Sequence, residues 1–172
     1  GPYSLITQQP LGGKAQFEAN LDNLFREDLG RSKYQFWAKF PDATGLVGQF
    51  SMGNEPSFHI PYLYNFTNSL WKTQQRTRFL LDTWYPDNMF GIPGDEDGGG
   101  MTAFVVFSMM GFYPVTPGMP WYTVGSPVFE QISVNLENGN VFTVKADGAS
   151  DINKYIQSAK FNGEAMGMPW FT

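Results

Sequence analysis

The sequence predicts an α+β fold in which helices come first and antiparallel strands follow. Three observations support this prediction. Apolar side chains recur at helical spacing near the N-terminus, residues 101–112 form a long apolar run, and residues 132–145 alternate between apolar and polar around an Asn-Gly pair. The pattern changes near residue 115, so we expect a helical part over 1–115 and β-hairpin strands over 116–172.

Four segments of the first part are expected to be helical. Apolar residues recur every three or four positions over 14–26, after a pair of glycines, as in an amphipathic helix. Pro56 suits the first turn of a short helix over 56–65. A further helix is expected over 71–84, before a Pro-Asp-Asn sequence ends it. The run 101–112 is apolar on nearly every face, which predicts a buried helix.

Two other segments carry different signals. Residues 29–53 are rich in aromatic residues and glycine and show no clean period, so we expect an ordered loop that helps to form a site. Residues 132–136 and 141–145 alternate, and Asn138-Gly139 between them predicts a type I′ hairpin turn. A second hairpin is expected, with arms 155–161 and 166–171 around another Asn-Gly pair.

Composition excludes several classes of protein. The 172 residues are 42% hydrophobic and 17% aromatic, enough for a packed core. The net charge is −5 and Lys and Arg form no block, so we expect no nucleic-acid partner. No apolar run approaches the roughly 20 residues that a membrane span needs. The absence of cysteine excludes disulfides and thiol chemistry.

The acidic triplet Asp95-Glu96-Asp97 is the strongest candidate for chemistry. Glycines flank it on both sides, so the bend presents several carboxylates with little side-chain bulk around them. Such a bend suits a general base or a hard cation. A solvated turn is the alternative, but the glycines and the apolar run that follows favour a functional loop. An EF-hand is excluded because the position of its bidentate Glu is Val106, and a P-loop because no Gly-Lys-Ser/Thr follows.

A second constellation pairs Glu55 with His59, the only histidine. The two are four residues apart, so they share a face if one helix contains both. A helix-start Glu and a half-buried His are an equally good interpretation. Neither a zinc protease nor a serine triad is supported, because His-Glu-x-x-His and Gly-x-Ser-x-Gly are absent. The 71–74 segment, Trp-Lys-Thr-Gln, combines groups that hold sugars, although an ordinary helix start explains it too.

The motifs together resemble glycoside hydrolase family 92, the calcium-dependent exo-acting α-mannosidases, and its bacterial members in particular. The resemblance covers essentially the whole chain. It is carried by GNEPSFHIPYLYNF at 53–66, WKTQ at 71–74, GIPGDEDGGGMTAFVVFSMMGFYPVTPG at 91–118 and YTVGSPVF at 122–129, with LGGKAQFEANLDNLF at 11–25 before them and NKYIQSAKFNGE at 153–164 after them.

The resemblance implies a particular architecture. The helices would be the last ones of an (α/α)6 barrel, and the strands would return to a β-sandwich. Four or so helices cannot make a twelve-helix barrel, so the chain is expected to be a C-terminal portion of the catalytic module. Its partners would be the missing N-terminal part of the same protein and a mannose-containing glycan. We expect a secreted, periplasmic or cell-surface bacterial protein.

The resemblance also implies the chemistry. Inversion at the anomeric carbon needs a carboxylic acid and a carboxylate base roughly 6.5–9.5 Å apart. The family's acid belongs to a Glu-Gly motif followed by Trp-Gln-Tyr, which this chain lacks, so the acid is expected outside it. By this resemblance the catalytic candidates are Asp95 and Asp97. The candidate ligands of Ca²⁺ are Asn54, Glu55 and Asp97. The substrate-binding candidates are Glu55, His59, Trp71, Lys72 and Gln74.

A hypothesis of a different class stays open beside the hydrolase. The chain could be a non-catalytic fragment that binds calcium or carbohydrate, or that has only a structural role. The family motif is also altered at Phe104, where many members have Trp, a change that affects packing more than chemistry.

Overall fold

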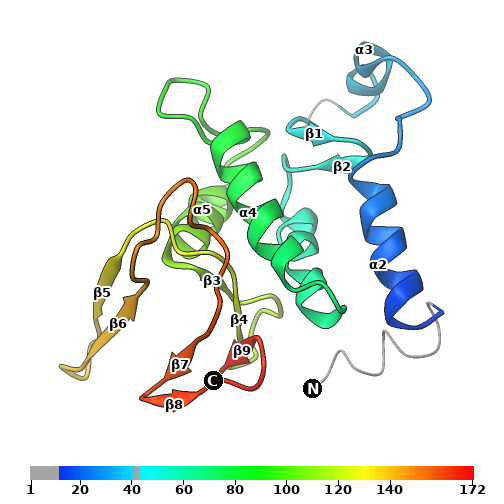
Figure 1. Ribbon diagram of the computed structural model, residues 1–172. Coiled ribbons are helices and arrows are strands. Elements are labelled where there is room, and N and C mark those ends of the chain that lie inside the picture. Colours follow the sequence, from blue (N-terminus) through cyan, green and yellow to red (C-terminus); the bar gives the residue numbers. More distant parts are fainter. Residues whose placement is uncertain (1–11, 41–42) are drawn as a thin grey trace.

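The computed structural model describes residues 12–40 and 43–172 and has the predicted α+β order (Figure 1). Helical segments dominate up to residue 110, and short antiparallel strands dominate from there on. The helical elements are α2 (Gly13–Leu24), α3 (Lys33–Trp37), η1 (Glu55–Ser57), η2 (Ile60–Phe66), α4 (Trp71–Trp84), η3 (Asp97–Gly99) and α5 (Gly100–Met110), where η denotes a 3₁₀ helix.

Helices α2 and α4 confirm the predicted segments, but the helix expected over 56–65 is wrong in kind. The chain there forms two separate 3₁₀ turns, η1 and η2, each with a proline in its first turn. Pro61 has no amide hydrogen to donate, so it cannot continue a helix that began at Pro56. The chain therefore restarts after His59.

The segment 29–53 is more regular than the expected loop. Helix α3 begins with a capping box, in which Ser32 and Gln35 exchange side-chain and backbone hydrogen bonds. Strands β1 (Leu46–Val47) and β2 (Phe50–Ser51) then form a short hairpin. Both elements are too short to give a periodic signal, which is why the pattern of apolar residues missed them.

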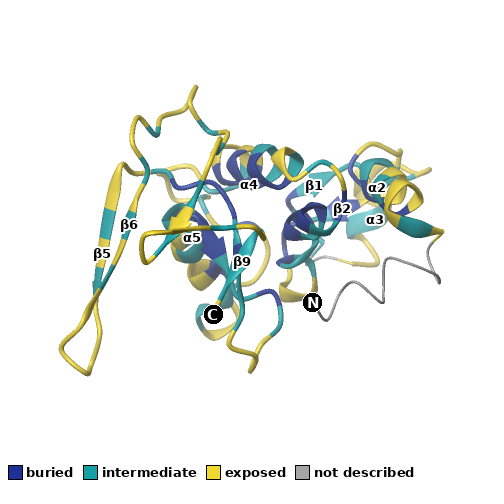
Figure 2. Ribbon diagram, turned by 60° about the horizontal axis from the view of Figure 1, so that its bottom comes forward, coloured by how far each residue is buried: buried dark blue, intermediate teal, exposed yellow. Residues whose placement is uncertain are grey.

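The core lies between α2, α4, α5 and the η1–η2 segment (Figure 2). The buried apolar side chains of this core cluster are Phe17, Leu21, Phe25, Phe50, Met52, Phe58, Tyr62, Tyr64, Leu80, Met101, Phe104 and Val115. Helix α5 corrects the prediction of an all-round buried helix, because only Met101, Phe104 and Ser108 are buried and Val106 is 55% exposed. One apolar face of α5 is therefore open in this chain.

The described strands pair antiparallel in small sheets. The order β3-β4-β9 forms one sheet, and β5-β6 and β7-β8 form hairpins. The strands are β3 (Phe112–Tyr113), β4 (Tyr122–Val124), β5 (Gln131–Asn135), β6 (Val141–Lys145), β7 (Lys160–Phe161), β8 (Glu164–Ala165) and β9 (Trp170–Phe171). Figure 1 shows the β5–β6 hairpin on the side of the molecule opposite to α2, with α4 between them.

Both predicted hairpins exist, with corrections. In the first turn only Gly139 has a positive φ, so that turn is not type I′. The connection between the two strands is longer, and a hydrogen bond from Gly139 N to Leu136 O closes it. In the second, Asn162 (φ 49°) and Gly163 (φ 88°) both have the positive φ that type I′ requires. The return arm of this second hairpin is short, because only β8 pairs with β7, and β9 pairs with β4 instead.

Arg78 joins the helical part to the strands. Its guanidinium is almost completely buried and donates to the carbonyl oxygens of Pro127 at 2.9 Å and Ser150 at 2.8 Å. A buried charge needs such partners, so these bonds fix the segments after β4 and β6 against α4. Among the described residues, no helix is both long enough and apolar enough to cross a membrane.

Candidate active site

The acidic loop connects α4 to α5 through three successive residues with left-handed backbone. Asp97, Gly98 and Gly99 have φ of 51°, 67° and 107°, and α5 begins at the next residue. Glycine adopts this conformation freely, whereas Asp97 does so at an energetic cost. The loop leaves the side chains of Asp95 and Asp97 exposed. Both predicted catalytic carboxylates are thus accessible at the first turn of α5.

The Asn54-Glu55 segment lies directly beside this loop. A Cβ atom at Gly94 would lie 2.1 Å from the carbonyl oxygen of Gly53, so only glycine allows the two backbones to approach this closely. The side chain of Glu55 covers the start of α5, because a Cβ at Gly100 would lie 3.3 Å from Glu55 Cγ. The contact between the two motifs brings Glu55 to the acidic loop.

Glu55 affects the protonation of the Asp97 carboxyl. A hydrogen bond with Glu55 raises the pKa of the Asp97 carboxyl, and the negative charges of Glu55 and Glu96 add to this effect. A neighbouring negative charge disfavours the ionised form of a carboxyl, and a bound cation would relieve that repulsion. The site therefore offers an oxygen-rich, negatively charged point at the surface.

The predicted metal ligands provide part of a coordination shell. Glu55 and Asp97 supply carboxylate oxygens, which hard cations such as Ca²⁺ prefer. Asn54 uses its Oδ1 to accept from the backbone N of Glu55 at 2.8 Å, which caps η1. No group of three or more His, Cys, Asp or Glu residues that could hold a metal occurs within residues 12–40 and 43–172. A cation here would need further oxygen ligands.

His59 does not share a helix with Glu55. It lies between the two 3₁₀ turns and is half-buried, and burial lowers the pKa of its imidazole. A hydrogen bond to the backbone of Pro56 opposes that shift. This geometry agrees better with a half-buried histidine than with a Glu55 and a His59 that point from one helix face into the same space.

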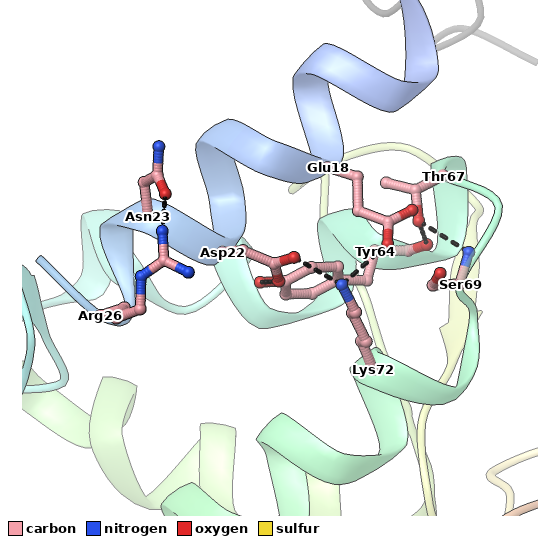
Figure 3. Close-up of polar contacts among 8 residues, drawn as sticks. All are labelled: Glu18, Asp22, Asn23, Arg26, Tyr64, Thr67, Ser69 and Lys72. Carbon is pink, nitrogen blue, oxygen red and sulfur yellow. Dashed lines mark hydrogen bonds and ion pairs between the residues drawn. The ribbon is translucent and has the colours of Figure 1, made fainter.

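Lys72 takes part in a charged cluster that joins α4 to α2 (Figure 3). Its Nζ donates to Glu18 Oε1 at 2.8 Å and to Asp22 Oδ2 at 2.5 Å, and Tyr64 donates to Asp22 Oδ1 at 2.9 Å. Figure 3 shows the ammonium between the two carboxylates. Two of its three donors are therefore already used within the fold.

Trp71 and Gln74 lie in the first turns of α4, away from the acidic loop. Gln74 is buried, and its Oε1 accepts from the backbone N of Ile156 at 2.9 Å. Trp71 is 48% exposed and lines a cavity of about 220 Å³ next to Gln74 and Ile156. Because Tyr85 at the other end of α4 contacts the start of α5, roughly 20 Å of helix separates Trp71 from the acidic loop.

Sequence reasoning did not find the part played by Glu96. Its Oε1 accepts from Thr102 Oγ1 at 2.6 Å and from Thr102 N at 3.3 Å, so the side chain turns toward the helix rather than toward solvent. The signal available in the sequence was an acid immediately before a helix, where acids bond to free N–H groups.

Comparison with known proteins gives the family. The model of the glycosyl hydrolase family 92 catalytic domain matches residues 4–172. The chain belongs to glycoside hydrolase family 92. An uncharacterized secreted glycosidase of Arthroderma benhamiae is 30% identical over 164 residues, which are 93% of this chain and 18% of that protein.

Solved family 92 structures have the same α+β arrangement of helices and small antiparallel sheets. The α-mannosidase BT3965 of Bacteroides thetaiotaomicron in complex with mannoimidazole matches with a TM-score of 0.85 and 33% identity, over 98% of this chain and 21% of that one. The inverting mannosidase BT2199 of the same organism matches with a TM-score of 0.73 and 34% identity, over 94% and 22%. This family 92 chain therefore spans about a fifth of the length of these relatives.

Proposed function

We propose that this chain carries the general-base loop of an α-mannosidase that releases terminal α-linked mannose from glycans with inversion. The observation that carries the proposal is the contact between Glu55 and the exposed Asp97 in the glycine-rich loop. Membership of family 92, and the likeness to a relative described as an inverting mannosidase, support it.

In the proposed mechanism, an exposed carboxylate of the loop removes a proton from water as the water attacks the anomeric carbon. Asp97 and Asp95 are the candidates for this base, with the other one orienting it. A general acid on the remainder of the protein protonates the leaving oxygen, roughly 6.5–9.5 Å from the base, and the water occupies the space between them. Inversion follows because the water attacks the face opposite to the leaving group.

We further propose that Ca²⁺ binds beside the base, held in part by Glu55 and Asp97, with Asn54 as a weaker candidate. The two adjacent carboxylates fit a hard cation, and the remaining oxygens would come from water, substrate or the rest of the protein. When bound, the ion would polarise sugar hydroxyls and help to distort the ring. Glu55 and His59 would contact the mannose unit nearest to the loop.

The remaining proposals concern the whole protein. We propose that the helices complete an (α/α)6 barrel with the rest of the polypeptide and that the strands belong to a β-sandwich. Trp71, Lys72 and Gln74 stay candidates for substrate binding, but Lys72 and Gln74 already use polar groups within the fold. Any contact that Trp71 makes would be with a part of the glycan roughly 20 Å from the loop. A secreted or periplasmic location agrees with the secreted relative.

The test is hydrolysis by the full-length family 92 protein that contains this chain. It should release mannose from an α-linked mannobiose and leave a β-linked one intact, and a calcium chelator should abolish the activity until Ca²⁺ is restored. Failure to hydrolyse any α-mannoside would favour the alternative, a non-catalytic module that binds calcium or carbohydrate. Calcium binding by calorimetry without hydrolysis would identify that alternative.

A further inference from the structure

Glu96 lies between the two acids assigned to catalysis, yet its carboxylate faces the protein. Oε1 accepts two hydrogen bonds from Thr102, at 2.6 Å from the hydroxyl and 3.3 Å from the backbone N. The backbone carbonyl of Glu96 accepts from Met101 N at 3.3 Å. Three bonds thus tie one residue of the acidic loop to the first turn of α5.

The second carboxylate oxygen of Glu96 is unusual. Oε2 is buried, and it accepts no hydrogen bond from any described residue. Burial raises the pKa of the Tyr85 phenol and the charge of Glu96 raises it further, which makes Tyr85 a neighbour of this carboxylate. A buried oxygen of a carboxylate without a partner costs free energy. Burying Oε2 therefore offsets part of the stability that the bonds of Oε1 to the start of α5 contribute.

The residue that follows Glu96 needs to be held. Asp97 has a left-handed backbone (φ 51°), and the next two residues continue in that region. A non-glycine residue keeps this conformation only when its surroundings fix it. Glu96 fixes the chain on one side of Asp97, whereas the other side consists of two glycines with no side chains to pack. The bonds between Glu96 and Thr102 therefore hold the backbone that carries Asp97, whereas Glu55 contacts the carboxyl itself.

We propose that Glu96 is a positioning residue that aims Asp97 at the attacking water by clamping the loop to Thr102. The inference rests on the proposed function, because it assigns Asp97 to the base. Glu96 itself transfers no proton and touches no substrate. Its required property is an acceptor oxygen at the position of Oε1. An amide oxygen keeps that acceptor, with a weaker bond than a carboxylate makes.

The test uses two pairs of variants in the full-length protein. Glu96→Ala and Thr102→Val each remove one side of the clamp, whereas Glu96→Gln and Thr102→Ser keep an acceptor and a donor. A displacement of about 1 Å in a reacting group lowers a rate by up to roughly a hundredfold. We expect kcat to fall by roughly tenfold to a hundredfold in the first pair with little change in KM, and the second pair to keep most of kcat.

The double variant Glu96→Ala/Thr102→Val separates a clamp from two independent effects. If the two side chains act together, the double variant should be no slower than the slower single variant. Normal kcat in both Glu96→Ala and Thr102→Val would overturn the inference. An equally large fall of kcat in Glu96→Gln and Glu96→Ala would overturn it too, because the charge of Glu96 would then be the property that matters. If Glu96→Ala fails to fold, the exposed Thr102 pair still decides. Absence of mannose release by the unaltered protein would instead overturn the proposed function.

Discussion

At the scale of single residues, the account depends on the exposed carboxylates of Asp95 and Asp97. We expect Asp97→Asn to lower kcat by about 10²–10⁴-fold, the usual effect of removing a general base. Because the side chain is exposed, the substitution should change the free energy of unfolding by less than about 0.5 kcal/mol. Asp95→Asn should also lower kcat with little effect on stability.

Steady-state kinetics and thermal unfolding of the full-length protein check this prediction. Glu137→Gln, in the exposed turn of the β5–β6 hairpin, is the matched control and should change neither property. Normal turnover in both loop variants, with an unchanged melting temperature, would remove this loop as the source of the base.

Lys72 gives a prediction about structure and pH. The pKa of Glu18 is lowered, chiefly by its hydrogen bond from Lys72. For Asp22, burial acts to raise the pKa, but the hydrogen bonds from Lys72 and Tyr64 outweigh burial, so this pKa is lowered as well. A lowered carboxyl pKa in the fold contributes stability above the ordinary carboxyl range, and that contribution is lost as the pH falls through the lowered pKa. The cluster should therefore weaken below about pH 4.

We expect Lys72→Met to weaken the packing of α2 against α4 at neutral pH, so that α2 opens to solvent more often. Hydrogen bonds to charged groups contribute about 1.5–3 kcal/mol, so amide exchange over Gly13–Leu24 should lose roughly tenfold or more of its protection. The difference from the unaltered protein should shrink as the pH is lowered toward 4 and below. Lys145→Met, at an exposed position in β6, is the control. Unchanged protection of α2 in Lys72→Met would show that the cluster does not hold this helix.

The sequence predicted the chemistry of individual residues better than their partners. The exposed acids in a glycine-rich bend could be recognised, because glycine and charge are local signals. The use of Lys72 and Gln74 could not, because their partners, Glu18, Asp22 and Ile156, lie 50 to 82 residues away. Long-range partners leave no local pattern in a single sequence.

At the scale of elements, the site depends on the close approach of two loops. Gly94 has φ +69°, and a Cβ atom there would lie 2.1 Å from the carbonyl oxygen of Gly53. We expect Gly94→Ala to separate the loops and to lose most of the activity, because Glu55 would move away from Asp97. Its cost to stability should exceed the roughly 1–2 kcal/mol of the left-handed backbone alone.

Gly139→Ala is the matched control, since Gly139 has φ +82° but nothing lies within 4 Å of an added Cβ. It should show the conformational cost without the collision, and it should keep full activity. Thermal unfolding and kinetics of both variants measure the difference. Equal activity in the two variants would mean that the approach of the loops is not needed for catalysis.

Elements with several turns or alternations were predictable, and short ones were not. Helix α4 and the hairpin β5–β6 repeat their pattern often enough to stand out from one sequence. The break between η1 and η2 depends on Pro61, and β9 pairs with β4 through tertiary contacts rather than local turn chemistry. The break at Pro61 decides where Glu55 lies, and the pairing of β9 with β4 decides where the C-terminal residues lie.

At the scale of the whole molecule, several large apolar side chains are exposed in this chain. Met89 and Phe90 are 88% and 78% exposed, and Val106 and Phe129 are 55% and 52% exposed. Large apolar side chains are exposed in this way where a partner segment covers them. Because the family 92 relatives are about five times longer, we expect the rest of such a protein to cover these side chains.

The isolated chain of residues 1–172 should therefore associate or aggregate. Size exclusion with intact-mass analysis of that chain tests this expectation. Elution as a larger species is expected, together with binding of a dye specific for apolar surface. A stable 19.4 kDa monomer with one cooperative unfolding transition would contradict it and would favour an independent, non-catalytic module.

The stereochemistry of the released sugar tests the central claim most directly. A base loop that activates water on the face opposite to the leaving group must release mannose as the β-anomer from an α-mannoside. Proton NMR of the first-formed sugar, recorded before the anomers equilibrate, distinguishes the two outcomes in the full-length protein. The account predicts an initial β-anomer that converts slowly to the mixture; an initial α-anomer would contradict it.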